Sequence, residues 1–233
     1  MRHHSEIHGE LLVQTELTTS HYTLGEEIAH AVTHGVGILL SITGLALLVT
    51  YASLYGDVWH IMSCSIYGAT LILLYTASTL YHGITAPRVK QILQRIDHAA
   101  IFLLIAGTYT PFTLVNLRGG WGWTLFGLVW AIAIFGVVLE VVVKKRIKWL
   151  SLSLYLGLGW LAVIVIKPMI DSVETGGLVL LLAGGLCYSL GVIFYVWKRL
   201  AYHHAVWHLF VLAGSILHFF SVLLYVVPPA GGV

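Results

Sequence analysis

Charged residues are scarce in this chain of 233 residues: Asp, Glu, Lys and Arg make up 9% of it, whereas hydrophobic residues make up 58%. A soluble globular domain carries about 25% charged residues, and so few charges cannot cover the apolar surface of a soluble protein of this size. A soluble enzyme, a nucleic-acid-binding protein and a disordered chain are therefore excluded. The mean hydropathy of +0.90 is typical of an integral membrane protein.

Cysteine is also rare. Cys64 and Cys187 lie far apart in apolar stretches and form no CxxC motif, which predicts inert buried thiols. The net charge of +2 is too small to indicate a nucleic acid or another polyanion as a partner. The first residues lack the basic start and short apolar run of a cleaved signal peptide. We expect residues 1–25 to form a polar tail before the membrane region.

Seven apolar segments reach the roughly 20 residues that a helix needs to cross a membrane. They are residues 28–53, 59–82, 97–117, 122–143, 149–168, 177–197 and 204–227. These runs are too long and continuous for barrel strands, so the sequence predicts an all-α integral membrane protein with seven transmembrane helices. The membrane domain is expected over residues 26–228, followed by a short tail at 229–233. Pro111 predicts a kink in the third span.

Basic residues are distributed unequally between the two sides of this predicted topology. Ten of the 12 Lys and Arg residues fall in the N-terminal tail and in the gaps after the second, fourth and sixth spans. Arg118 and Lys167 are left on the opposite side. The positive-inside rule therefore predicts a cytoplasmic N-terminus and a C-terminus outside.

Histidine is abundant, with 13 residues, and most histidines of the membrane region fall near the cytoplasmic side of the predicted topology. His82 ends the second span, Asp97 begins the third, and His204 and His208 begin the seventh. Residues four apart project from one face of a helix. This spacing pairs His204 with His208, and it also pairs Ser78 with His82.

These residues predict a metal site. His204 and His208 form a two-point chelate, and His82 adds a third imidazole, for a metal with affinity for nitrogen, zinc foremost. Three histidines plus water is the pattern of an open zinc site, and Asp97 could hydrogen-bond a ligand or that water, with the Ser78 hydroxyl nearby. Alternatively, the histidines only hydrogen-bond headgroups or backbone, and Asp97 caps its helix. We favour the metal, because ionisable groups within membrane spans are usually functional.

Other histidines are expected to have ordinary structural roles. His98 and His203 are predicted to be solvated or interfacial residues. His218 lies in the middle of the seventh span, where a neutral, hydrogen-bonded imidazole is expected.

Four ordered motifs carry a resemblance to a known family: EEIAHAVTHGVG (26–37), STLYH (78–82), RIDHAAIFLLIAGTYTPF (95–112) and HHAVWHLFVLAGSILHF (203–219). Through them the chain resembles the hemolysin III branch of the progestin and adipoQ receptor family. The resemblance implies a seven-helix membrane protein, N-terminus inside, that binds zinc near the cytoplasmic face. It implies His82, His204 and His208 as zinc ligands, Asp97 as the residue that holds the zinc-bound water, and Ser78 beside it.

The first motif adds residues close to the implied site. Glu27 and His34 match the family pattern there. Where the family usually has Asn, this chain has His30, one turn before His34. His30 would be either a fourth ligand that closes the site or a hydrogen-bonding substitute, and we favour the substitute.

The resemblance also implies a chemistry, because eukaryotic relatives resemble hydrolases of lipid amide bonds, notably ceramidases. We expect a zinc-dependent hydrolase of lipid amide or ester bonds, in a multi-pass protein of the bacterial inner membrane whose partners are membrane lipids. A first alternative is a non-catalytic regulator of membrane-lipid homeostasis with structural zinc. A second is a cytolytic, membrane-disrupting protein, although the spans lack the repeating polar face that a pore needs. The oligomeric state stays open.

Overall fold

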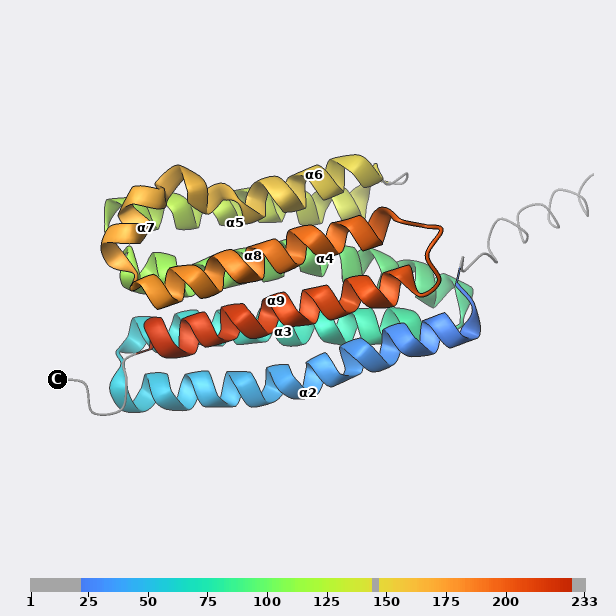
Figure 1. Cartoon of the computed structure of the whole chain (residues 1–233), viewed down its shortest axis with the longest axis horizontal. Helices are drawn as coiled ribbons and strands as arrows, with labels where there is room; N and C mark the ends of the chain where they lie inside the picture. Colours follow the sequence, from blue (N-terminus) through green and yellow to red (C-terminus); the bar gives the residue numbers. More distant parts are fainter. Residues whose placement is uncertain (1–21, 144–146, 228–233) are drawn as a thin grey trace, which may run out of the picture.

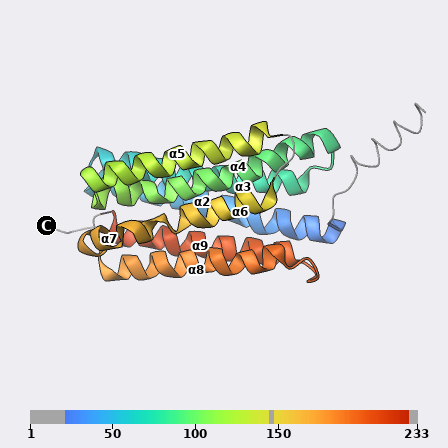
Figure 2. The ribbon, with the colours of Figure 1, turned by 90° about the horizontal axis from the view of Figure 1, so that it is seen from above.

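The helices lie side by side along the long axis of a single bundle, as Figure 1 shows for this computed structural model and Figure 2 shows from above. The structure describes residues 22–143 and 147–227. Within these ranges, seven helical passes are long and apolar enough to cross a membrane, and no strand is present. The prediction of an all-α membrane protein with seven spans is confirmed. Both cysteines are free.

In chain order the elements are α2 (Leu24–Tyr55), α3 (Val58–Gly83), α4 (Pro87–Pro111), the π-helical segment η1 (Phe112–Asn116), α5 (Gly120–Val142), α6 (Lys148–Gly159), the 3-10 segment η2 (Leu161–Val165), α7 (Ile166–Ser172), α8 (Thr175–Val196) and α9 (His203–Tyr225). The beginnings of α2, α4 and α9 and the end of α3 lie at one end of the bundle (Figure 1). We call this the histidine end.

The third pass differs from its predicted range of 97–117. The basic stretch at 85–95, expected to be a gap, supplies the first turns of α4, which has Pro87 at its first position. Proline is favoured there because its fixed φ suits a helix and its missing N–H would have no partner in that turn. At the other end, α4 gives way at Pro111 to the π-helical segment, where the sequence predicts a kink.

The fifth pass is broken in the middle, whereas the sequence predicts one continuous span at 149–168. The α-helix stops at Gly159 and resumes at Ile166 after a 3-10 turn. The Tyr109 hydroxyl from α4 bridges the break: it donates to the carbonyl oxygen of Gly159 at 2.8 Å and accepts from the amide of Ala162 at 2.9 Å. Freed backbone groups inside a membrane need such partners.

Small residues and a hydroxyl cluster hold α3, α8 and α9 together. A Cβ atom on Gly184 of α8 would overlap the ring of His218, so only glycine permits this close approach to α9. Nearby, the hydroxyls of Tyr75 and Tyr188 each lie 2.8 Å from Ser215 Oγ. These contacts fix the position of α9, and therefore of the histidines at its start.

Asp57 begins α3 at the end of the bundle opposite the histidine end. Its Oδ1 accepts from the amides of Trp59 at 2.9 Å and His60 at 3.2 Å. We expect Asp57→Ala to lower the free energy of unfolding by about 1 kcal/mol, the usual effect of losing an N-cap. Thermal unfolding in detergent measures it. Asp57→Ser keeps a capping oxygen and should remain close to the wild type; equal losses in both variants would contradict the capping role.

The Asp57 effect should also depend on pH. Burial raises the pKa of this carboxyl, but the hydrogen bonds from His60 and Trp59 outweigh it, so the pKa lies below its usual value. A lowered pKa in the folded state means that the charged form stabilises the fold above the unfolded pKa, near 4. That contribution is lost as the pH falls through the lower, folded-state pKa. The difference between wild type and Asp57→Ala should therefore shrink in acid.

Candidate metal centre

Five buried histidines from three helices meet at the histidine end of the bundle. Two pairs lie one turn apart on their helices: His30 and His34 on α2, and His204 and His208 on α9. The fifth, His82, is in the last turn of α3. None exposes more than 7% of its surface. Because residues four apart share a helix face, each pair points from its own helix toward the same interior space.

His82, His204 and His208 form a candidate metal-binding group. One possible ligand atom from each lies within 4.8 Å of the other two. The ring centroids of His204 and His208 are 4.6 Å apart, and each lies 5.2 Å from that of His82. The fold thus brings together the three residues that the sequence proposes as metal ligands, from helices more than 120 residues apart in the chain.

Glu27 orients His82. Its Oε2 lies 2.7 Å from His82 Nδ1, so the carboxylate accepts the Nδ1 proton. Its other oxygen, Oε1, pairs with Lys90 Nζ at 3.0 Å. Lys90 also donates to the carbonyl oxygen of Tyr81 at 3.0 Å, at the end of α3. A carboxylate on one nitrogen fixes the tautomer and leaves the other nitrogen as a lone-pair donor, and His82 Nε2 has no hydrogen-bond partner.

His208 is held by α2. Its Nδ1 lies 3.3 Å from the carbonyl oxygen of His30 and 3.3 Å from Thr33 Oγ1. The His34 ring stacks on the His208 ring, with centroids 3.5 Å apart and planes 8° from parallel. Glu27 and His34, predicted to lie near the site, therefore both contact one of its candidate ligands.

Tyr22 covers the histidines where the chain enters α2. Its ring meets that of His30 edge-on at 4.8 Å and stacks on that of His204 at 5.3 Å. Burial raises the pKa of the Tyr22 hydroxyl above its usual value, so it is neutral at pH 7. Tyr22 belongs to the segment 1–25, which the sequence predicts to be a polar tail. Residues 1–21 of that segment lie outside the described ranges. The helix α2 already begins at Leu24, within the predicted tail.

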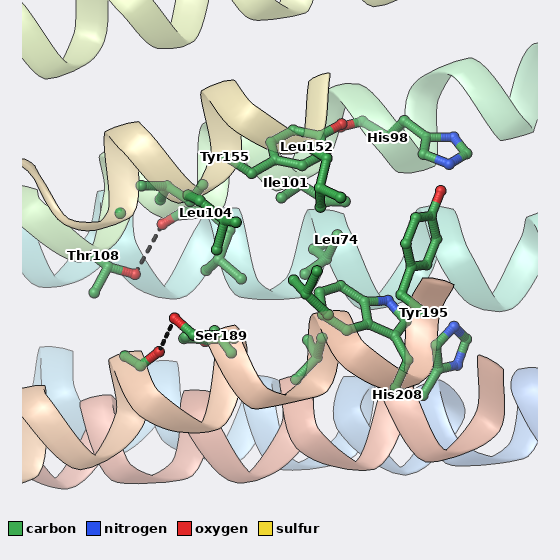
Figure 3. Close-up of a pocket in the computed structure, with 18 of the residues that line it drawn as sticks. Leu74, His98, Ile101, Leu104, Thr108, Leu152, Tyr155, Ser189, Tyr195 and His208 are labelled. Atoms are coloured by element: carbon green, nitrogen blue, oxygen red, sulfur yellow. Dashed lines mark hydrogen bonds between the residues drawn. The ribbon is translucent and has the colours of Figure 1, made fainter. Parts of the chain in front are cut away.

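A cavity begins beside these histidines. Ser78, Asp97, His204 and His208 all line it, together with side chains of α4, α6 and α8. Figure 3 shows His98, Tyr195 and His208 toward one end and Thr108 and Ser189 toward the other. The lining is mainly apolar, which suits a hydrocarbon chain better than a polar solute.

Asp97 and Ser78, proposed from sequence as catalytic residues, lie in the wall of this cavity rather than in a ligand group. Asp97 is 8% exposed and Ser78 is 1% exposed. The Ser78 hydroxyl oxygen is buried without a hydrogen-bond partner. Both residues therefore belong to the cavity wall, where neighbouring atoms cover the Ser78 oxygen.

The unpaired nitrogens at this end of the bundle suit a metal ion. Among the described residues, buried nitrogens without a hydrogen-bond partner include His82 Nε2, His204 Nδ1 and both ring nitrogens of His30. Leaving a buried polar group unpaired costs about 1–3 kcal/mol. Imidazole nitrogen is a preferred ligand of zinc and similar transition metals, so the donor set fits such an ion.

Two nearby histidines differ from the prediction that they are solvated or interfacial. His98 and His203 are both buried, with 8% and 5% exposure. Each uses Nδ1 on a backbone carbonyl oxygen, that of Gln94 at 2.6 Å and that of Phe194 at 3.1 Å. Each therefore has a hydrogen-bond partner inside the protein, and His98 also lines the cavity. His218 donates from Nε2 to the carbonyl oxygen of Leu181 at 3.0 Å, as expected for a neutral buried histidine.

The sequence of this chain is similar to a family model and to several known proteins. A family model described as "Haemolysin-III related" matches residues 22–219. The chain is 50% identical over 206 residues to the Hemolysin-3 homolog of Bacillus subtilis. The aligned residues make up 88% of this chain and 97% of that protein. The chain is 47% identical over 205 residues to Hemolysin-3 of Bacillus cereus (88% and 94%). The human monocyte to macrophage differentiation factor is 29% identical over 209 residues (87% and 85%).

Proposed function

Since this chain belongs to the haemolysin-III-related family, we propose that it is a zinc-dependent hydrolase that cleaves amide or ester bonds of membrane lipids. One observation carries the proposal: three buried histidines could hold a metal, and two of them, His204 and His208, also line a largely apolar cavity. The reacting bond would lie beside the histidines, and the lipid chain would occupy the cavity. With the excess of basic residues taken as cytoplasmic, the site faces the inner leaflet of the bacterial inner membrane.

The protein groups around the reacting bond have separate roles in this proposal. A zinc ion held by His82, His204 and His208 would supply a Lewis acid and lower the pKa of water to about 7. Asp97 would orient the attacking water and accept its proton as a general base. Ser78 would donate its hydroxyl hydrogen to the carbonyl oxygen as that oxygen gains negative charge.

Release of fatty acid tests the proposal. Purified, zinc-loaded protein would be incubated in detergent with a ceramide and, separately, with a phosphatidylglycerol. We expect Asp97→Asn to slow hydrolysis by about 10²- to 10⁴-fold and Ser78→Ala by about 10²- to 10³-fold. Both variants should keep their metal. Ser41→Ala, which removes a buried hydroxyl bonded to the Gly37 carbonyl oxygen in α2, is the matched control and should keep full activity.

Absence of hydrolysis of either lipid by zinc-loaded wild type would contradict the enzyme and favour a second function. That function is a non-catalytic regulator of membrane-lipid homeostasis, in which zinc ties α3 to α9. The buried His30 beside the three candidate ligands favours it, because a fourth protein ligand is typical of structural zinc. A membrane-disrupting role, which the name Hemolysin-3 of two relatives suggests, has less support, because the cavity lining is mainly apolar.

A further inference from the structure

His30 is nearly as close to the candidate ligands as they are to one another. Its ring centroid lies 4.6 Å from that of His82, 4.8 Å from that of His204 and 5.4 Å from that of His208. The three candidate ligands are themselves 4.6 to 5.2 Å apart. The four rings therefore lie close together, although by its ligand atoms His30 groups with Glu27 and His82 rather than with His204 and His208.

The structure shows no hydrogen-bond partner for the His30 side chain. The side chain is 0% exposed, and neither ring nitrogen has a hydrogen-bond partner. The edge-on contact with Tyr22 covers the ring but leaves its nitrogens unpaired. By contrast, His82 has Glu27 on Nδ1, and His203 has a backbone carbonyl. Two unpaired nitrogens on a fully buried imidazole are costly in an apolar interior, unless a ligand takes one of them.

We propose that His30 is a fourth protein ligand of the metal, so that the resting site is closed by four imidazoles. The inference rests on the metal site of the proposed function and deepens it by deciding between the hydrolase and the regulator, because a site closed by four protein ligands is typical of structural zinc. One possible ligand atom from each of Glu27, His30 and His82 also lies within 4.8 Å of the others. The His30 ring therefore lies near the Glu27 carboxylate as well as near the other histidines.

The ligand count of the wild-type protein tests the inference. X-ray absorption of the zinc-loaded protein in detergent counts imidazole ligands directly. We expect four in the wild type and three in His30→Asn, with zinc bound at least about 10-fold more weakly by the variant in competition with a chelator. His203→Asn is the matched control, because His203 is buried next to the site with its Nδ1 on a backbone carbonyl oxygen. It should keep four imidazoles.

The possible outcomes separate this inference from the proposed function. Three imidazoles in zinc-loaded wild type, with zinc affinity unchanged in His30→Asn, would overturn the role of His30 and leave the three-histidine site standing. A wild type that binds no zinc would overturn both. If His30→Asn fails to fold, three imidazoles in the wild type would still overturn the role of His30. Four imidazoles in both the wild type and His34→Asn would support it, because His34 is the other histidine beside the site with both ring nitrogens unpaired.

Discussion

Replacing His208 by alanine is expected to abolish stable zinc binding. His208 supplies one of three nitrogens that converge within 4.8 Å, and its imidazole is buried. Loss of a residue that only supports a ligand already weakens metal binding by about 10- to 100-fold, and loss of a ligand should weaken it further. Metal analysis after gel filtration should give about one zinc per chain for the wild type and none for the variant.

Thermal unfolding gives a second measure of the same loss. Free zinc at about 100 times its Kd should stabilise the wild type by about 2.7 kcal/mol, whereas His208→Ala should not respond to zinc. His203→Ala is the control: it truncates a buried histidine on the same helix whose nitrogen bonds a backbone carbonyl. Stoichiometric zinc in His208→Ala, or equal loss in both variants, would contradict the proposed ligand set.

The sequence predicts the helical passes well because hydropathy measures the property that a membrane selects. The prediction fails where a property other than hydropathy determines where a helix begins or breaks. The third pass begins at Pro87, because a helix can continue through the charged edge of the membrane. There Arg88 is exposed, and Arg95 donates to the carbonyl oxygen of Val141 at 2.8 Å. The break in the fifth pass depends on the Tyr109 hydroxyl from a different helix. No local pattern in residues 149–168 could indicate that contact.

The sequence likewise predicts one part of the candidate site and misses another. His204 and His208 are paired by spacing alone, and the membrane topology brings His82 to their level. From the sequence, Lys90 is one of the basic residues that predict the orientation of the protein in the membrane. In the structure it also pairs with Glu27. Nothing in a single basic residue after the second span distinguishes a partner of Glu27 from a residue that sets topology. This contact joins α2 to the first turn of α4, where Lys90 lies, and the sequence pattern does not specify that proximity.

Replacing Glu27 by leucine is expected to destabilise the protein and weaken zinc binding together. The carboxylate lies between Lys90 Nζ at 3.0 Å and His82 Nδ1 at 2.7 Å. The side chains of Glu27 and Lys90 are only 11% and 15% exposed. Removing one member of a buried ion pair leaves the other charge uncompensated, which costs about 3 kcal/mol. His82 would also lose the partner that fixes its tautomer, so zinc affinity should fall by about 10- to 100-fold.

A double-mutant cycle separates these two effects. With a chelator present, Glu27→Leu alone should lose about 3 kcal/mol, and adding Lys90→Met should restore part of it, because no unpaired charge then remains. Zinc affinity should stay low in the double variant, since His82 still lacks its carboxylate. Glu27→Gln keeps an acceptor for His82 Nδ1 and should retain more affinity than Glu27→Leu. Additive stability losses, or equal zinc affinity in Glu27→Gln and Glu27→Leu, would show that the carboxylate neither compensates Lys90 nor orients His82.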